Sequence, residues 1–132
     1  MPKAEGLEIS FLSESHIKTD LLETFQFDSA NQLIETTTLE FSAVCPFSGL
    51  PDVAAVEIVY RPIGGKCMEL KSLKYYFTSF RNVGIYQEGV TKRIYKDLRK
   101  LLFGAFDAPP LVVKTTYNTR GGFDTICTEG EL

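Results

Sequence analysis

The chain has 132 residues, of which 44% are hydrophobic and 23% are charged, and its formal net charge is −3. These values fit one compact domain with a real core, and they give no basic signal for nucleic acid or an anionic membrane. No run approaches the ~20 apolar residues of a membrane span, and the N-terminal stretch "MPKAEGLEIS" has no apolar signal core.

The cysteine and histidine counts limit the chemistry. Three cysteines, an odd number, form neither a disulfide framework nor a paired metal-binding motif. Reduced thiols in a cytoplasmic protein are the simpler interpretation. The only histidine is His16, which weakens any scheme that needs a histidine ligand pair or a Cys–His dyad. We expect no metal site from this composition.

The first predicted elements are two strands. Residues 1–30 are polar with scattered apolar side chains, and we expect an N-terminal extension without an assignable element. Residues 33–44, "LIETTTLEFSAV", are rich in threonine and apolar residues and predict a strand. After a Pro/Gly turn, residues 53–61 predict a second strand, and the loop "PIGGK" follows. One face of the second strand carries Ala54, Val56, Ile58 and Tyr60.

Two helices and a terminal hairpin are predicted next. Apolar residues recur at helical spacing within 69–82 and again within 88–102. The two apolar stripes are Leu70, Leu73, Phe77 and Phe80, and Val90, Ile94, Leu98 and Leu101. The prolines of "FDAPP" stop the second helix, since neither can continue it. Residues 111–117 and 122–129, joined through "NTRGG", predict the hairpin.

The element order is therefore strand, strand, helix, helix, strand, strand. Residues 31–132 predict a single α+β domain in which antiparallel strands carry both helices on one face. Such a small sheet leaves edges and one face uncovered, so we expect the chain to oligomerise.

The stretch "VCPFSGLPD", residues 44–52, places a cysteine at a bend, with an aspartate seven residues later. A cysteine at such a turn, with a carboxylate returning toward it, suits a nucleophile. The alternative is a small buried core residue, which is the usual place of an arbitrary cysteine.

Three segments together resemble a known family. "VCPFSGLPD", "ELKSLKYYFTSFRN" and "YQEG" are similar, in order and spacing, to the NADPH-dependent 7-cyano-7-deazaguanine reductases, the nitrile reductases of queuosine biosynthesis in tRNA modification. The resemblance runs from about Glu40 to Arg120, and Glu69 to Tyr76 fits the family signature at every position. It implies the tunnelling fold for the catalytic domain at 31–132. It also implies NADPH as cofactor, a small deazaguanine substrate, and rings of identical subunits with active sites between neighbours.

The resemblance assigns catalytic roles to two residues. Cys45 is expected to add to the nitrile carbon and give a thioimide, which accepts hydride more readily than the nitrile does. Asp52 matches the family's acid–base residue, and a carboxyl group screened from water can hold a proton near neutral pH. The alternative for Asp52 is an aspartate that hydrogen-bonds its own turn. Cys67, in a predicted loop, and Cys127, in a predicted strand, match no motif and are expected to be structural.

The expected substrate contacts are Glu88, Gln87 and Glu69. Glu88 matches the glutamate that grips the guanine-like edge, because a carboxylate can accept two hydrogen bonds. An acidic residue also suits a helix start for purely electrostatic reasons. Glu69 opens the signature and is expected to position the neighbouring loop or the substrate. Gln87 stands where the family usually has a histidine, and glutamine cannot shuttle a proton.

The expected cofactor contacts are Lys71, Ser72, Lys74 and Arg120. The resemblance implies that the two lysines and the arginine of "RGG" hold NADPH phosphates. Without that resemblance, two lysines three residues apart on a helix are usually a solvated face. No GxGxxG motif is present, so a Rossmann site is not expected.

Three functions stay open at this point. The first is the nitrile reductase, acting on a free base without direct nucleic-acid or membrane contact. The second is the related archaeosine-forming amidinotransferase, which uses the same Cys and Asp on a nitrile already in tRNA. The third is a non-catalytic binder of deazaguanine or pterin-like bases. The signature at Glu69 to Tyr76 and the acidic charge favour the reductase over the transferase, while Cys45 and Asp52 together argue against the binder.

Overall fold

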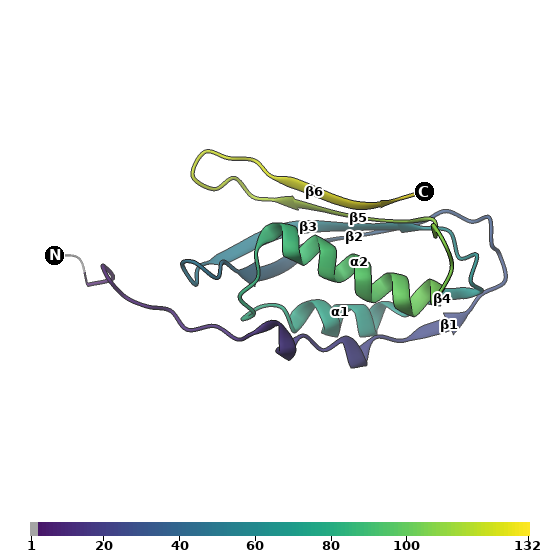
Figure 1. The fold of residues 1–132 in the computed structure, drawn as a ribbon, viewed down its shortest axis with the longest axis horizontal. Coiled ribbons are helices and arrows are strands. Elements are labelled where there is room, and N and C mark those ends of the chain that lie inside the picture. The colour runs from purple at the N-terminus through teal and green to yellow at the C-terminus, as the bar shows by residue number, and fades with distance from the viewer. Residues whose placement is uncertain (1–2) are drawn as a thin grey trace.

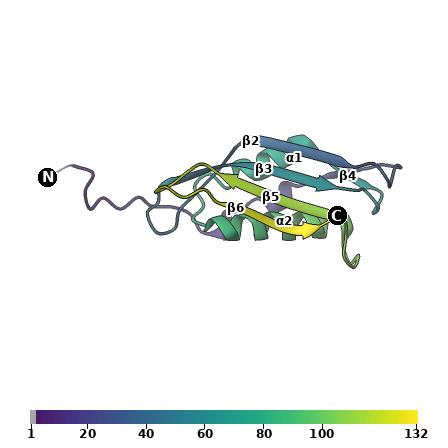
Figure 2. The ribbon, with the colours of Figure 1, turned by 90° about the horizontal axis from the view of Figure 1, so that it is seen from above.

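A four-stranded antiparallel sheet carries both α-helices on one face, as Figure 1 shows. The structure is a computed structural model that describes residues 3–132. The strand order across the sheet is β2-β3-β5-β6, so the two consecutive hairpins lie side by side, and Figure 2 shows all four strands from above. The elements are β2 (Ile34–Val44), β3 (Pro51–Tyr60), α1 (Leu70–Thr78), α2 (Gln87–Phe103), β5 (Leu111–Tyr117) and β6 (Ile126–Glu131). This arrangement confirms the predicted α+β fold.

The core lies between the sheet and the helices. Side chains alternate between the two faces of β3. The predicted apolar face points toward α1 and α2, and its four residues are buried: Ala54, Val56, Ile58 and Tyr60. The same alternation recurs in β5, where Leu111 and Val113 are buried. No helix in the described range 3–132 is long and apolar enough to cross a membrane.

The helical stripes agree with the structure except at two positions. Leu73, Phe77 and Phe80 are buried as predicted, although α1 ends at Thr78 and Phe80 lies in the turn that follows it, and Leu70 is 57% exposed. As the first residue of α1, Leu70 lies over a groove beside β2 and does not reach the core. On α2 the stripe ends on Leu102, which is buried more fully than the predicted Leu101.

The predicted start of the last strand is wrong. Residues 122–129 were expected to be extended, but β6 pairs with β5 only from Ile126, which lies opposite Thr116. The residues before it form a loop that is closed by a tight turn at Gly121 and Gly122. The hairpin itself is present, with a longer connection than the sequence indicated.

The sequence did not indicate a second, two-stranded sheet. β1 (Thr24–Gln26) pairs antiparallel with β4 (Lys66–Met68). Three residues are too few to show a strand's alternation, so neither segment gave a signal. Cys67, predicted to lie in a loop, is instead buried within β4.

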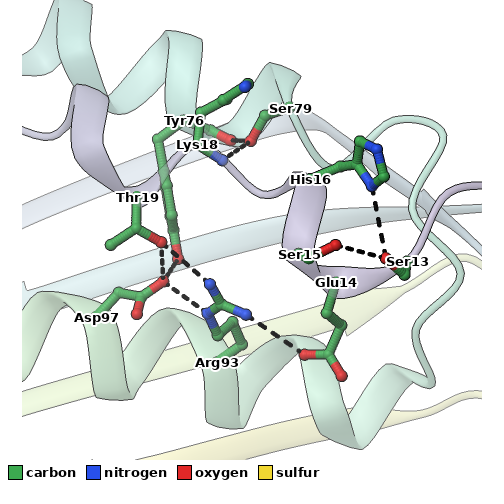
Figure 3. A network of polar contacts seen from close by, with 10 residues as sticks. All are labelled: Ser13, Glu14, Ser15, His16, Lys18, Thr19, Tyr76, Ser79, Arg93 and Asp97. Atoms are coloured by element: carbon green, nitrogen blue, oxygen red, sulfur yellow. Dashed lines mark hydrogen bonds and ion pairs between the residues drawn. The ribbon is translucent and has the colours of Figure 1, made fainter.

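The chain before β1 packs against both helices. Two 3₁₀ turns, η1 (Glu14–His16) and η2 (Thr19–Leu21), flank the buried residue Ile17. A buried polar network then joins this segment to the helices, as Figure 3 shows. Asp97 Oδ2 accepts hydrogen bonds from the Thr19 hydroxyl at 3.0 Å, the Tyr76 hydroxyl at 2.7 Å and the Arg93 Nε at 2.9 Å. The predicted domain boundary near residue 30 stays a prediction.

Candidate active site

Cys45 lies directly after β2, at the first position of a tight turn. Its backbone N–H donates to the Leu50 carbonyl at 2.9 Å, and the Gly49 N–H donates to the Cys45 carbonyl at 2.7 Å. Gly49 has a φ of +72°, and a Cβ there would lie 2.6 Å from the Ile9 carbonyl oxygen. The turn therefore needs glycine at this position, and it holds a partly exposed thiol at the end of the sheet.

The environment of Cys45 favours its thiolate. Burial raises the pKa of the thiol, but the backbone N–H groups of Ser48 and Phe47 and the Ser48 hydroxyl lower it by a larger total. The charge of Asp52 acts in the raising direction, and the net pKa is below the ordinary value. A thiolate is the nucleophilic form of cysteine, so the turn prepares this residue for attack on an electrophile.

Asp52 lies on β3, directly across from Ala43 of β2, and is 5% exposed. Its Oδ1 forms an ion pair with Nη1 of Arg120, which lies in the β5–β6 loop. The same nitrogen lies 3.5 Å from the Pro51 carbonyl oxygen. The structure thus places Arg120 beside the predicted acid–base residue, a contact that the sequence did not indicate.

The start of α2 brings Gln87 and Glu88 to the same end of the molecule. The buried Tyr117 hydroxyl donates to the Gln87 carbonyl at 3.3 Å. Burial raises the pKa of Tyr117, and the charges of Cys127, Asp52 and Glu88 raise it further. Asp52 and Glu88 therefore both lie near one phenol. Sequence analysis missed Tyr117, whose only signal is its place at the end of an alternating strand.

Glu69 and Ser72 hold the start of α1. The Glu69 carboxylate caps the helix by accepting the N–H groups of Lys71 and Ser72, each at 3.0 Å. The Ser72 hydroxyl donates to the Glu69 carbonyl at 2.8 Å and accepts the Glu23 N–H at 3.0 Å. Both side chains thus make local hydrogen bonds that fix the helix and the segment leading to β1.

Lys71 and Lys74 are exposed on α1, and neither forms an ion pair within residues 3–132. Lys74 lines a groove of about 220 Å³ between α1 and β2, together with Arg81, Thr38 and other residues. Lys71 lines a neighbouring hollow beside Thr36. Exposed ammonium groups at the rim of a groove suit an anionic ligand.

The predicted site residues fall into two groups along β2. The β2–β3 turn, the β5–β6 loop and the start of α2 lie at one end of the molecule, on the left in Figure 1. The first group belongs to this end: Cys45 lies in the turn, Asp52 at the start of β3, and Arg120 in the loop. Lys71 lies at the other end of β2, near Thr36. Thr36 and Cys45 are nine positions apart, which is roughly 30 Å along a strand. Within one chain Lys71 is therefore distant from Cys45, whereas the groove lined by Lys74 extends along β2 as far as Phe41.

Metal ligands do not gather in this structure. Within the part of the chain that is described, no group of three or more His, Cys, Asp or Glu side chains is placed to hold a metal ion.

Comparisons with known proteins agree with one another. A family model described as "QueF-like protein" matches residues 51–131. The whole chain is 55% identical to the NADPH-dependent 7-cyano-7-deazaguanine reductases of Thermotoga petrophila and Thermotoga maritima, and it covers 93% of each. The protein of the same name from Caldicellulosiruptor bescii is 47% identical over 111 residues, which are 83% of this chain and 81% of that one.

A solved structure supports the fold. The archaeosine synthase QueF-Like in its apo form superposes with a TM-score of 0.64, covering 75% of this chain and 92% of the other. The two sequences are 20% identical, so this likeness concerns the fold alone. It confirms the tunnelling fold.

Proposed function

The chain belongs to the family of QueF-like proteins, and from that premise we propose that it is an NADPH-dependent nitrile oxidoreductase of queuosine biosynthesis. It converts 7-cyano-7-deazaguanine to 7-aminomethyl-7-deazaguanine. The observation that carries this proposal is the pair formed by a thiol of lowered pKa at Cys45, in the turn of the β2–β3 hairpin, and the buried carboxylate of Asp52 at the start of β3. The 55% identity to proteins named as this reductase supports it.

The proposed chemistry begins with a covalent bond to Cys45. The Sγ atom attacks the nitrile carbon, and a C–S bond forms as one C–N π bond breaks. Asp52 accepts the thiol proton and delivers it to the nitrile nitrogen, so no net proton is consumed in forming the thioimide. When bound, NADPH supplies hydride. Two hydrides and two protons complete the conversion: Cys45 departs as a thiolate, one proton goes to the amine nitrogen, and the other restores the Cys45 thiol.

Glu88 is the proposed anchor for the substrate. Its carboxylate can accept hydrogen bonds from a ring N–H and an exocyclic amine of a guanine-like base. It lies in the first turn of α2, whose first carbonyl is held by Tyr117. Gln87 and Glu69 stay proposals as substrate contacts, and Glu69 supports the site through the capped start of α1.

Lys71 and Lys74 are the proposed contacts for the cofactor's phosphates, and Arg120 of a neighbouring subunit is proposed as a third. Ser72 contributes by fixing the helix start, since its hydroxyl is already engaged with the backbone. The two exposed ammonium groups fit phosphate oxygens, which accept charge-assisted hydrogen bonds. Because Lys71 lies at the far end of β2 from Cys45, a cofactor whose phosphates are held there is proposed to reach Cys45 of a neighbouring subunit.

We therefore propose that the enzyme is a homo-oligomer with active sites between subunits. Large apolar side chains are exposed around the Cys45 end, among them Phe47 at 90% and Phe123 at 77%. Large apolar side chains left exposed at one end of the molecule favour an interface there. β2 and β6 are also open edges of the sheet, which are available for pairing with another chain.

The substrate is proposed to be the free base, and the site of action the cytoplasm. The net charge of −3 offers no general attraction to the phosphate backbone of tRNA. The three cysteines are unpaired thiols, as is usual in reducing compartments. The archaeosine-forming alternative has support only from a fold likeness at 20% identity, so the reductase is the better account.

The test separates adduct formation from reduction. With 7-cyano-7-deazaguanine and no NADPH, intact-protein mass spectrometry should show one substrate mass on the wild type and on Cys127→Ala, but none on Cys45→Ala. NADPH added afterwards should be oxidised, and 7-aminomethyl-7-deazaguanine should be released. A thioimide that forms but is not reduced at saturating NADPH would overturn the reductase assignment.

Gln87 offers a second test, because the family usually has histidine there. Glutamine donates and accepts hydrogen bonds but does not carry a proton between groups. Gln87→His should therefore speed NADPH oxidation in single-turnover measurements and leave the rate of adduct formation unchanged. A change confined to adduct formation would show that this position acts on the nucleophile.

A further inference from the structure

The backbone position of Arg120 is fixed by the tight turn that follows it. Gly121 and Gly122 have φ values of +56° and +85°, and both being positive is typical of a type I′ turn. The residues on either side exchange two hydrogen bonds: the Arg120 N–H donates to the Phe123 carbonyl at 3.0 Å, and the Phe123 N–H donates back at 2.9 Å. Arg120 therefore leaves the turn at a fixed position over the start of β3.

The Asp52 carboxylate is held on one side only. Oδ1 is paired with Arg120, while Oδ2 makes no hydrogen bond to any described side chain or backbone group. Every fully buried side-chain oxygen in residues 3–132 has a hydrogen-bond partner. Oδ2 must therefore keep contact with solvent, although Asp52 as a whole is buried. One oxygen is fixed, and the other is free to exchange a proton.

We propose that Arg120 is a positioning residue for Asp52 and acts on thioimide formation before any cofactor contact. This inference rests on the function proposed above and adds a role to the phosphate contact assigned to the same side chain. By holding Oδ1, Arg120 leaves Oδ2 to accept the Cys45 thiol proton and to deliver it to the nitrile nitrogen. The proton moves from Sγ to Oδ2 to nitrogen, and no oxidant or reductant is needed.

The charges that face Asp52 explain why an arginine is needed. Asp52 is near enough to Cys45, in the turn after β2, and to Tyr117, on β5, for its charge to act on both, and the charge of Glu88 acts on the same phenol. The Cys45 thiolate is anionic, whereas the raised pKa of Tyr117 keeps its phenol neutral, and Arg120 is the cation paired with Asp52. Without Arg120, the Asp52 charge would oppose the Cys45 thiolate without compensation.

The first experiment measures adduct formation with no NADPH present. Arg120→Ala should slow the appearance of the Cys45 adduct at least about tenfold, because general acid–base groups contribute roughly 100-fold or more. Arg120→Lys should recover part of the rate, since it restores the charge. Arg99→Ala is the matched control, because Arg99 donates to the Phe106 carbonyl, well outside this site, and its rate should equal that of the wild type.

A second readout needs no substrate. Peptide mass spectrometry measures the rate of Cys45 alkylation by iodoacetamide from pH 6 to 9. The pH at which this rate rises should be higher in Arg120→Ala than in the wild type and should return toward the wild-type value in Arg120→Lys. Unchanged adduct rate and unchanged alkylation profile in Arg120→Ala would overturn the positioning role and leave the reductase assignment intact. Absence of any adduct on the wild type would overturn both.

Discussion

The Asp97 and Asp52 carboxylates each lie near an arginine and a tyrosine, but they differ in how many hydrogen bonds they accept. Asp97 Oδ2 takes three donors, from Thr19, Tyr76 and Arg93, in the network of Figure 3. Asp52 takes one donor, on Oδ1. The other oxygen of each carboxylate accepts no hydrogen bond from a described group, so the difference lies in the number of donors. Three donors from three segments hold Asp97 in place, whereas Asp52 is held by one arginine at the end of the hairpin. For these two aspartates, the number of hydrogen bonds that the carboxylate accepts distinguishes a structural role from a catalytic one, which the residue type alone does not.

Asp52→Asn should produce the largest effect on activity. An amide cannot accept the thiol proton, so we expect adduct formation to fall roughly 100-fold or more. The free energy of unfolding should change little, because the partly exposed Arg120 stays solvated. Stopped reactions analysed by mass spectrometry give the rate, and urea unfolding gives the stability. A large loss of stability with normal adduct formation would reverse the roles of the two carboxylates.

Asp97→Ala should produce the largest effect on stability. It leaves Tyr76, Thr19 and Arg93 without their acceptor, which we expect to cost about 3 kcal/mol. Urea unfolding at fixed protein concentration measures the change. Glu57→Ala is the control, since Glu57 and Lys114 form an exposed ion pair at 3.9 Å that should contribute less than about 1 kcal/mol. Equal losses in the two variants would show that the buried network adds nothing.

Ser48→Ala should shift the reactivity of Cys45 by a smaller amount. The Ser48 hydroxyl lowers the pKa of Cys45, so its removal raises that pKa and reduces the thiolate fraction at neutral pH. We expect alkylation at pH 7 to slow about fivefold, the equivalent of one hydrogen bond of roughly 1 kcal/mol. The rates of wild type and variant should converge at high pH, where both thiols are ionised. A difference that persists there would point to altered access.

Tyr117→Phe should produce the smallest effect. It removes the hydrogen bond to the Gln87 carbonyl, worth roughly 1 kcal/mol, and loosens the start of α2 around Glu88. We expect a higher KM for the nitrile base with little change in kcat, measured by steady-state NADPH consumption. Thr91→Val is the comparison, because it breaks the neighbouring contact between the Thr91 and Thr115 hydroxyls at 2.6 Å. A fall in kcat alone would assign Tyr117 to the chemical step.

The sequence predicted what is local and missed what is distant. The alternation of β3 and the helical stripe of α2 are carried by neighbouring residues, so their elements could be predicted. Cys45 and Asp52 were identified because both lie in one nine-residue stretch. The contact between Asp52 and Arg120 spans 68 positions, and no periodic pattern encodes it. The Asp97 network joins three separate segments, and it was not predicted for the same reason.

The backbone of the Cys45 turn also limits how this sequence can change over evolution. At Gly49, a side chain would meet the Ile9 carbonyl and would require an uncommon left-handed conformation, two separate obstacles at one position. Gly121 has a positive φ but open space around it, and asparagine tolerates that conformation. In a library of all single substitutions, position 49 should retain glycine alone, while position 121 should drift to asparagine or aspartate. The surroundings of the nucleophile are thus under a stricter mutational constraint than the turn that carries its arginine.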